Sequence, residues 1–110
     1  MDKERGMPEM IVLRDVLRNP EEYAGWLYLK DQPWTLSSPG FFYLEDKDLA
    51  PADEEKLREG FKAQGWISTV SSEDIEDAIA NTRDQLEDPG EQDLLEAVQF
   101  FFKNDAFKAW

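Results

Sequence analysis

The apolar residues of this chain change their spacing partway along it, and this change constrains the fold most. Over residues 26–70 they come mainly in short runs rich in aromatic side chains, whereas from Ile75 onward they recur at the period of an α-helix. Short strands followed by a pair of amphipathic helices are typical of an α+β domain. We therefore expect a small antiparallel sheet of three or four strands and about four helices.

Four short runs are the predicted strands, at residues 26–29, 34–36, 41–44 and 66–70. They are rich in aromatic and β-branched residues, and turn-forming residues bound them. The first three follow one another closely enough to predict an antiparallel meander. Successive residues within the runs are apolar, so both faces of the sheet should be covered at least in part.

The last two predicted helices follow the sheet. Residues 75–86 carry apolar side chains at helical spacing after a capping serine, Ser71 or Ser72, and a second apolar stripe runs over residues 94–102. Only a few residues around Pro89 separate the two stripes. We therefore expect an antiparallel pair of helices packed on the sheet, with Ile79 and Val98 buried where the stripes face each other.

Two shorter helices are predicted before that pair. Apolar residues within 11–17 indicate about two turns of helix, which should end at Asn19 because Pro20 disfavours the helical conformation in the residue before it. Residues 53–64 have acids in their first turn and Leu57 and Phe61 on one face, and Gly65 follows as a C-terminal stop.

The chain has the size of a single domain. Its 110 residues suffice for one hydrophobic core, and residues 1–10 lack periodicity. We expect a flexible tail over residues 1–10 and one α+β domain over residues 11–110. Met1, Met7 and Met10 all remain candidate translation starts.

The absence of cysteine removes any disulfide framework, and no apolar run has the length of a membrane span. The N-terminal residues also lack the apolar stretch of a signal peptide. A cytoplasmic location is the expectation that follows.

The chain is strongly acidic, with 25 Asp and Glu against 12 Lys and Arg and a formal net charge of −13. The second part carries most of this charge: residues 1–44 hold seven acids and five bases, whereas residues 45–110 hold eighteen acids and seven bases. Nucleic acids and anionic membranes are bound largely through Lys and Arg. We therefore expect neither direct nucleic-acid binding nor membrane binding.

The residue types that serve most enzymes are missing. The chain has no His and no Cys, and neither of the common glycine-rich phosphate loops occurs. Asp74 and Asp77, one helical turn apart, could share a hard cation, but acids in a first turn are also explained by the helix dipole. We expect no catalytic residue, no metal and no cofactor.

Six aromatic residues of the strand region could line a ligand groove or form an interface, because Trp and Tyr dominate binding energies. In a small sheet such residues more often belong to the core. The six are Trp26, Tyr28, Trp34, Phe41, Tyr43 and Trp66. We expect Trp34 to be the exception, an exposed anchor for a partner, because polar and turn-forming residues flank it.

Three segments, residues 14–29, 34–36 and 101–107, resemble a family of short bacterial proteins of unknown function. The resemblance covers most of the chain from Ile11 onward. It implies a small, acidic, cytoplasmic domain, and the family offers no catalytic residue to carry over. In size and charge such domains are similar to immunity proteins of toxin systems, which is an analogy and not homology.

The leading hypothesis is a non-enzymatic binding protein, most concretely an immunity or antitoxin-like inhibitor that covers a basic site on a partner such as a nuclease toxin. Basic clefts that grip phosphate are complementary to carboxylates, which also speed association. The expected acidic contact surface comprises Asp53, Glu54, Asp74, Asp77, Asp84, Glu87 and Asp88. The alternatives are an interaction module whose acidity serves solubility, and a metal-dependent enzyme built on carboxylates. The oligomeric state stays open.

Overall fold

The computed structural model describes residues 8–30, 33–45 and 48–110 and has an α+β fold, as the sequence predicts. Most of the predicted N-terminal tail, residues 1–7, lies outside the described residues. In chain order the elements are β1 (Ile11–Val12), α1 (Leu13–Arg18), the short 3-10 helix η2 (Pro20–Glu22), β2 (Trp26–Leu29), β3 (Pro39–Tyr43), α2 (Pro51–Ala63), β4 (Ile67–Ser71), α3 (Ser72–Gln85) and α4 (Glu91–Asn104).

The four strands form one antiparallel sheet in the order β1-β3-β2-β4. The two central strands pair in a regular register that sets Trp26 opposite Tyr43 and Tyr28 opposite Phe41. In this order β4 is an edge strand and continues directly into α3. The sheet therefore joins three strands from residues 11–43 to β4, which leads into the last two helices.

Two of the sequence predictions for this region are wrong. Ile11 and Val12 are extended and pair with β3, so α1 begins only at Leu13. Residues 34–36 form no strand. The backbone there bonds to α1 instead, because the Leu36 carbonyl accepts a hydrogen bond from the Arg14 amide at 2.9 Å. The segment thus satisfies donors in the first turn of α1 instead of joining the sheet.

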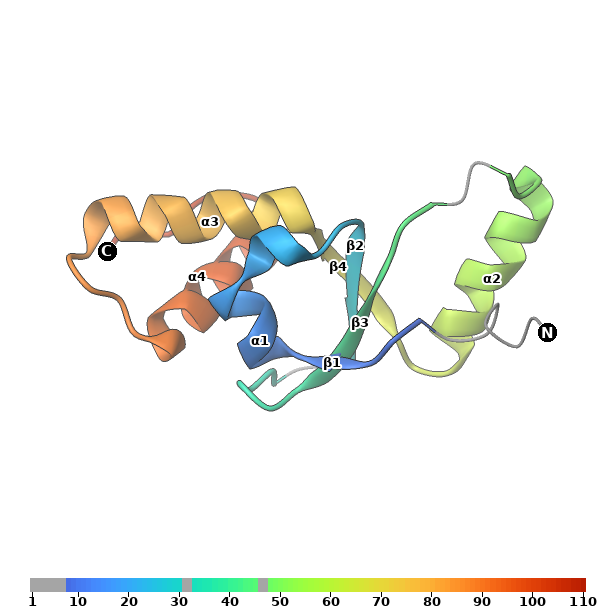
Figure 1. Cartoon of the computed structure of the whole chain (residues 1–110), viewed down its shortest axis with the longest axis horizontal. Helices are drawn as coiled ribbons and strands as arrows, with labels where there is room; N and C mark the ends of the chain where they lie inside the picture. Colours follow the sequence, from blue (N-terminus) through green and yellow to red (C-terminus); the bar gives the residue numbers. More distant parts are fainter. Residues whose placement is uncertain (1–7, 31–32, 46–47) are drawn as a thin grey trace.

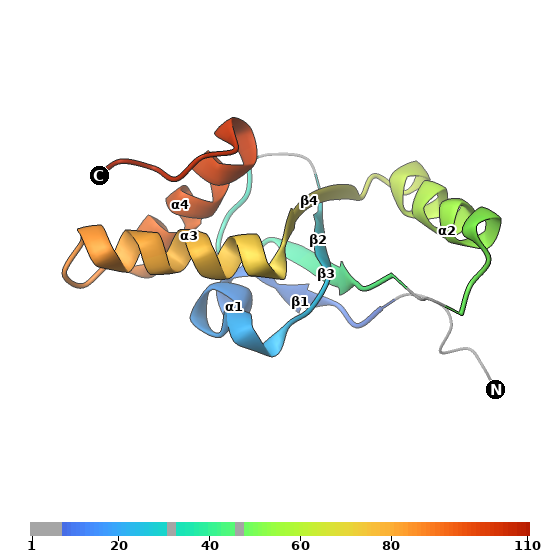
Figure 2. The same cartoon turned by 90° about the horizontal axis from the view of Figure 1, so that it is seen from above.

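Helices cover both faces of the sheet. Figures 1 and 2 show α1, α3 and α4 on one side of the strands and α2 on the other. Side chains alternate across β2, so Leu27 and Leu29 face the larger helical layer while Tyr28 faces α2. We call the buried residues on the side of α1, α3 and α4 the α3–α4 core and those on the side of α2 the α2 core. The α3–α4 core comprises Leu13, Val16, Leu17, Leu27, Leu29, Trp34, Val70, Ile75, Ile79, Leu94, Leu95 and Val98. The α2 core comprises Tyr28, Phe41, Phe61 and Trp66.

The pair α3 and α4 confirms the prediction made from the two apolar stripes. The Ser71 hydroxyl accepts a hydrogen bond from the Asp74 amide at 3.1 Å, and the Asp74 carboxylate accepts one from the Ser71 amide, which forms a capping box. The two helices pack together, and Ile79 and Val98 are both buried in the α3–α4 core. Sequence periodicity therefore located this part of the core correctly.

Glu91 ties the start of α4 to α1. Its carboxylate accepts hydrogen bonds from the Nε–H groups of Arg14, at 3.3 Å, and of Arg18. The hydrogen bond from Arg18, reinforced by the charges of both arginines, lowers the pKa of the Glu91 carboxyl below its ordinary value. A carboxyl whose pKa is lowered by folding stabilises the protein above its unfolded pKa, and this contribution is lost as the pH falls through the folded pKa.

We expect Glu91→Gln to lower the melting temperature near neutral pH by a modest amount, because surface ion pairs contribute little. The difference from the wild type should shrink as the pH falls through the lowered pKa of Glu91 in the folded protein, where the wild-type carboxylate takes up its proton. Thermal melts at a series of pH values measure this difference. Glu96→Gln, an exposed acid of the same helix, is the matched control. A deficit that stays constant down to pH 2 would contradict the linkage.

Candidate functional site

The predicted acidic residues do not form one surface. Asp77, Asp84, Glu87 and Asp88 are exposed on α3 and the turn that follows it, whereas Asp53 is exposed on α2. Figure 1 shows α2 and the α3–α4 turn at opposite ends of the molecule, whose longest extent is 47 Å. A partner that contacts the α3 acids is therefore remote from Asp53.

Glu54 contradicts the prediction of a surface acid, because only 4% of it is exposed. It precedes Leu57 and Phe61 by three and seven residues, which places it on the face of α2 that meets the sheet. Its Oε2 accepts hydrogen bonds from the Tyr43 hydroxyl and, at 3.4 Å, from Arg58, whereas its Oε1 has no hydrogen-bond partner within the described part of the chain. Glu54 therefore links α2 to β3 through its hydrogen bond with Tyr43.

Asp74 is half-buried and committed to the capping box of α3, so its carboxylate already has a structural role. Among the described residues, no group of three or more acids comes close enough to hold a metal ion. None of the described helices combines the length and the apolarity that a membrane crossing requires.

The prediction that Trp34 stands exposed at a loop edge is wrong, because 5% of this residue is exposed and its ring lies in the α3–α4 core. The ring packs on Phe102, with the centroids 5.1 Å apart, and its Nε1–H donates to the Lys30 carbonyl at 3.1 Å. Its described neighbours Pro33, Thr35 and Ser37 are exposed, whereas the indole is buried.

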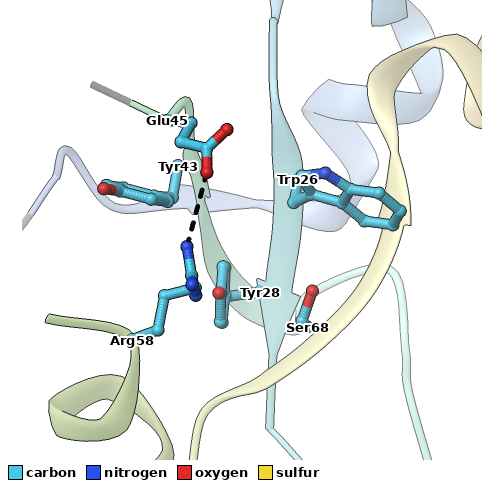
Figure 3. Close-up of a pocket in the computed structure, with 6 residues that line it drawn as sticks. All are labelled: Trp26, Tyr28, Tyr43, Glu45, Arg58 and Ser68. Carbon is cyan, nitrogen blue, oxygen red and sulfur yellow. Dashed lines mark ion pairs between the residues drawn. The ribbon is translucent and has the colours of Figure 1, made fainter. Parts of the chain in front are cut away.

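The exposed tryptophan of the sheet is Trp26, 48% of which is accessible. It borders a hollow of about 350 Å³ between the sheet and α2 (Figure 3). This volume lies within the range of small-ligand sites, roughly 300–1,000 Å³. The residues that line the hollow are Trp26, Tyr28, Tyr43, Glu45, Arg58 and Ser68.

The register of the sheet builds the floor of this hollow. Trp26 and Tyr28 are two residues apart on β2, and Tyr43 lies opposite Trp26 on β3. Gly25 allows this arrangement because its φ is +102° and a Cβ there would lie 2.4 Å from the Tyr43 carbonyl oxygen. On the other side, β4 bulges between Ser68 and Ser71, and the Thr69 hydroxyl donates to the Leu27 carbonyl at 2.7 Å.

Helix α2 forms the opposite wall. Phe61 anchors it by edge-to-face contacts with Tyr28, at 5.2 Å, and Phe41, at 4.9 Å between ring centroids. Arg58, one turn earlier, extends over the floor toward Glu45, as Figure 3 shows. The distance between the Arg58 nitrogen and the Glu45 carboxylate oxygen is 3.7 Å, and both side chains are exposed. The ion pair therefore contributes little to stability and leaves both groups accessible.

A second hollow of about 290 Å³ continues from the first and shares Tyr28, Arg58 and Ser68 with it. Lys62, Trp66 and Ile67 complete its lining. We call the two hollows together the aromatic groove. Four aromatic side chains, an arginine and a lysine along one groove present apolar contact area with positive groups at the α2 wall.

Sequence reasoning placed Trp26, Tyr28 and Tyr43 among six candidates for a groove but expected Trp34 to be the exposed one. The available signal was the parity of β2, which puts Trp26 and Tyr28 on one face of the strand. The contribution of Arg58 had no such signal, because it depends on where α2 docks.

The comparisons with known proteins give a family and no further relative. No curated protein and no solved structure matches the chain. A family model, described as a domain of unknown function, matches residues 10–110. This agrees with the resemblance to a family of unknown function, whereas the analogy with immunity proteins still rests on size and charge alone. The chain belongs to the family DUF7716.

Proposed function

We propose that this domain is a non-enzymatic protein-binding module and that the aromatic groove is its main contact surface. One observation carries the proposal: a half-exposed tryptophan lies beside two tyrosines and an arginine over a hollow in the surface. Trp, Tyr and Arg are the residue types in which binding energy concentrates at protein interfaces, and hot spots cluster where pockets exclude water.

The polar groups of the groove support binding better than catalysis. Among the described residues, its lining contains one carboxylate, Glu45, which is largely exposed and faces Arg58, and one hydroxyl other than the tyrosines, that of Ser68. An acid–base mechanism needs a titratable group held within hydrogen-bond reach of the reacting atom. An exposed glutamate paired with an arginine is instead a natural orienting group for a partner.

The test uses the protein that co-purifies with the tagged domain from its native host, once that protein has been isolated. Titration calorimetry should show that Trp26→Ala weakens the complex about 30-fold or more, the loss expected of an interface anchor. Trp110→Ala is the matched control, because Trp110 is the other partly exposed tryptophan and contacts Thr82 on α3. Equal affinities for Trp26→Ala and wild type would refute the groove as the main contact.

A second candidate function, the inhibitor of a basic partner, is favoured by the acids of α3. Residues 72–105 hold eleven Asp and Glu against Arg83 and Lys103. Asp77 and Asp84 are seven residues apart on one exposed face, and neither is in an ion pair among the described residues. Such a face attracts a basic protein, as an immunity protein or antitoxin would attract a nuclease.

If this second function holds, association with the isolated partner should be at least about tenfold faster at 0.01 M than at 0.15 M salt, because the Debye length falls from about 30 Å to about 8 Å. Reversal of Asp77 and Asp84 to Lys should slow association in stopped-flow measurements. Reversal of Asp53 and Glu55, exposed acids of α2, changes the net charge equally and is the control. A salt-independent rate, or equal effects of both reversals, would indicate that the acidity serves solubility.

A further inference from the structure

Two basic side chains line the second hollow of the aromatic groove, within a protein of net charge −13. Arg58 and Lys62 line it from successive turns of α2, and none of the described residues in its lining is a carboxylate. Lys30 is not part of this lining but contacts one of its members, because its Nζ lies 4.3 Å from the centroid of the Trp66 ring. Two of the twelve bases of the chain therefore line one largely apolar hollow, and a third contacts one of its rings.

These bases differ in how they are already engaged. Arg58 contacts Glu45 and Glu54, and the Lys30 ammonium donates to the Gln64 carbonyl at 2.7 Å. Lys62 forms no ion pair with any residue that the structure describes. It is exposed and lines the hollow, so an incoming carboxylate can reach it without displacing an ion-pair partner from the described residues.

The remaining lining of the second hollow is mostly apolar. Tyr28 and Trp66 are buried in the α2 core, and Ile67 is partly exposed at the start of the edge strand β4. Apolar lining recognises aliphatic or aromatic groups through the area removed from water, whereas a base at the rim fixes an acid beside them. The charge and the apolar surface act on neighbouring groups of the same ligand.

We infer that the aromatic groove binds a segment of a partner protein in which an Asp or Glu neighbours a large apolar residue, with the apolar side chain in the second hollow and the carboxylate beside Lys62. The inference rests on the proposed function and names the chemistry of its partner. Because Trp26 lies in the first hollow, the segment continues past Arg58 and Ser68 and contacts the indole of Trp26.

The experiment uses three pools of terminally blocked pentapeptides with Glu, Gln or Lys at the centre and mixed Leu, Ile, Phe and Tyr beside it. Each pool is titrated into ¹⁵N-labelled protein at 0.15 M salt, where a Debye length of about 8 Å screens the acids of α3. The indole signals of Trp26 and Trp66 report binding. We expect the Glu pool to bind about two- to fivefold tighter than the Gln pool, as one exposed ion pair allows, and the Lys pool to bind weakest.

Lys62→Gln should remove the preference for the Glu pool over the Gln pool. Lys56→Gln is the matched control, because Lys56 is an exposed base of α2 outside the lining of the groove. Equal binding of the Glu and Gln pools, a preference unchanged by Lys62→Gln, or no shift of either indole with any pool would overturn the inference. Any of these results together with a Trp26→Ala defect toward the isolated partner would leave the proposed function standing.

Discussion

Replacement of Phe41 with alanine is expected to lower the free energy of unfolding by about 3–5 kcal/mol, the largest effect of any single substitution considered for this domain. Phe41 is fully buried at the centre of the α2 core. Its ring stacks on Tyr28 at 5.2 Å and meets Phe61 at 4.9 Å and Trp66 at 5.1 Å between centroids. Alanine would leave a cavity beneath α2 that three rigid rings cannot fill.

Urea unfolding monitored by circular dichroism measures this loss. Leu44→Ala, at an exposed position just after β3, is the control and should change stability by no more than about 0.5 kcal/mol. A loss below about 1 kcal/mol for Phe41→Ala would show that α2 does not pack on the sheet as described. Because Phe61 and Tyr28 also support Arg58 and the floor of the groove, the variant should lose partner binding as well.

Ile79→Ala is expected to cost about 2–5 kcal/mol on the other side of the sheet. Ile79 lies in the α3–α4 core with 2% of it exposed, and Val98 of the facing helix belongs to the same cluster. The side chain is held between two helices and the sheet, so the site collapses only in part when three carbon atoms are removed.

Ile67→Ala is the matched control for Ile79→Ala, because Ile67 is partly exposed and its loss should cost no more than about 1 kcal/mol. Phe41→Ala and Ile79→Ala should both move one common unfolding transition, since a single sheet carries both cores. Two separate transitions, with each substitution moving only one of them, would contradict that view.

The sequence predicted the structure most accurately where one apolar stripe of helical period packs against one surface. Residues 75–86 show the helical period clearly, a serine cap marks the start, and Ile79 is buried as expected. The errors fall where short apolar runs fit two interpretations. The apolar residues Ile11 and Val12 fit a helix and a strand equally well. Their pairing with β3 makes them a strand.

Trp34 and Glu54 show a second limit, because in both cases the flanking residues suggested exposure. Trp34 is surrounded by turn formers, yet the space between β2 and α4 accepts its ring. Glu54 was predicted to be exposed among first-turn acids, yet Tyr43 and Arg58 supply polar partners for it beneath α2. The burial of these two side chains depends on tertiary partners that local sequence does not specify.

The aromatic groove, too, could be predicted from the sequence only in part. Strand parity puts Trp26 and Tyr28 on one face, which the sequence reveals, but a groove exists there only because α2 packs on the Phe41 end and leaves the Trp26 end open. The position of α2 is set by Phe61 against three rings from two strands. Such an arrangement of segments distant in sequence is visible only in the folded chain.

The four tryptophans allow the most direct test of the aromatic groove as the contact surface. Trp26 and Trp66 line the groove, Trp34 is buried in the α3–α4 core, and Trp110 contacts Thr82 on α3. A ¹⁵N–¹H spectrum of the domain, recorded with and without the isolated partner, resolves one indole signal for each. We predict that the Trp26 signal moves most, the Trp66 signal also moves, and the Trp110 signal stays in place. Movement of Trp110 with Trp26 unchanged would contradict the account and place the partner on α3.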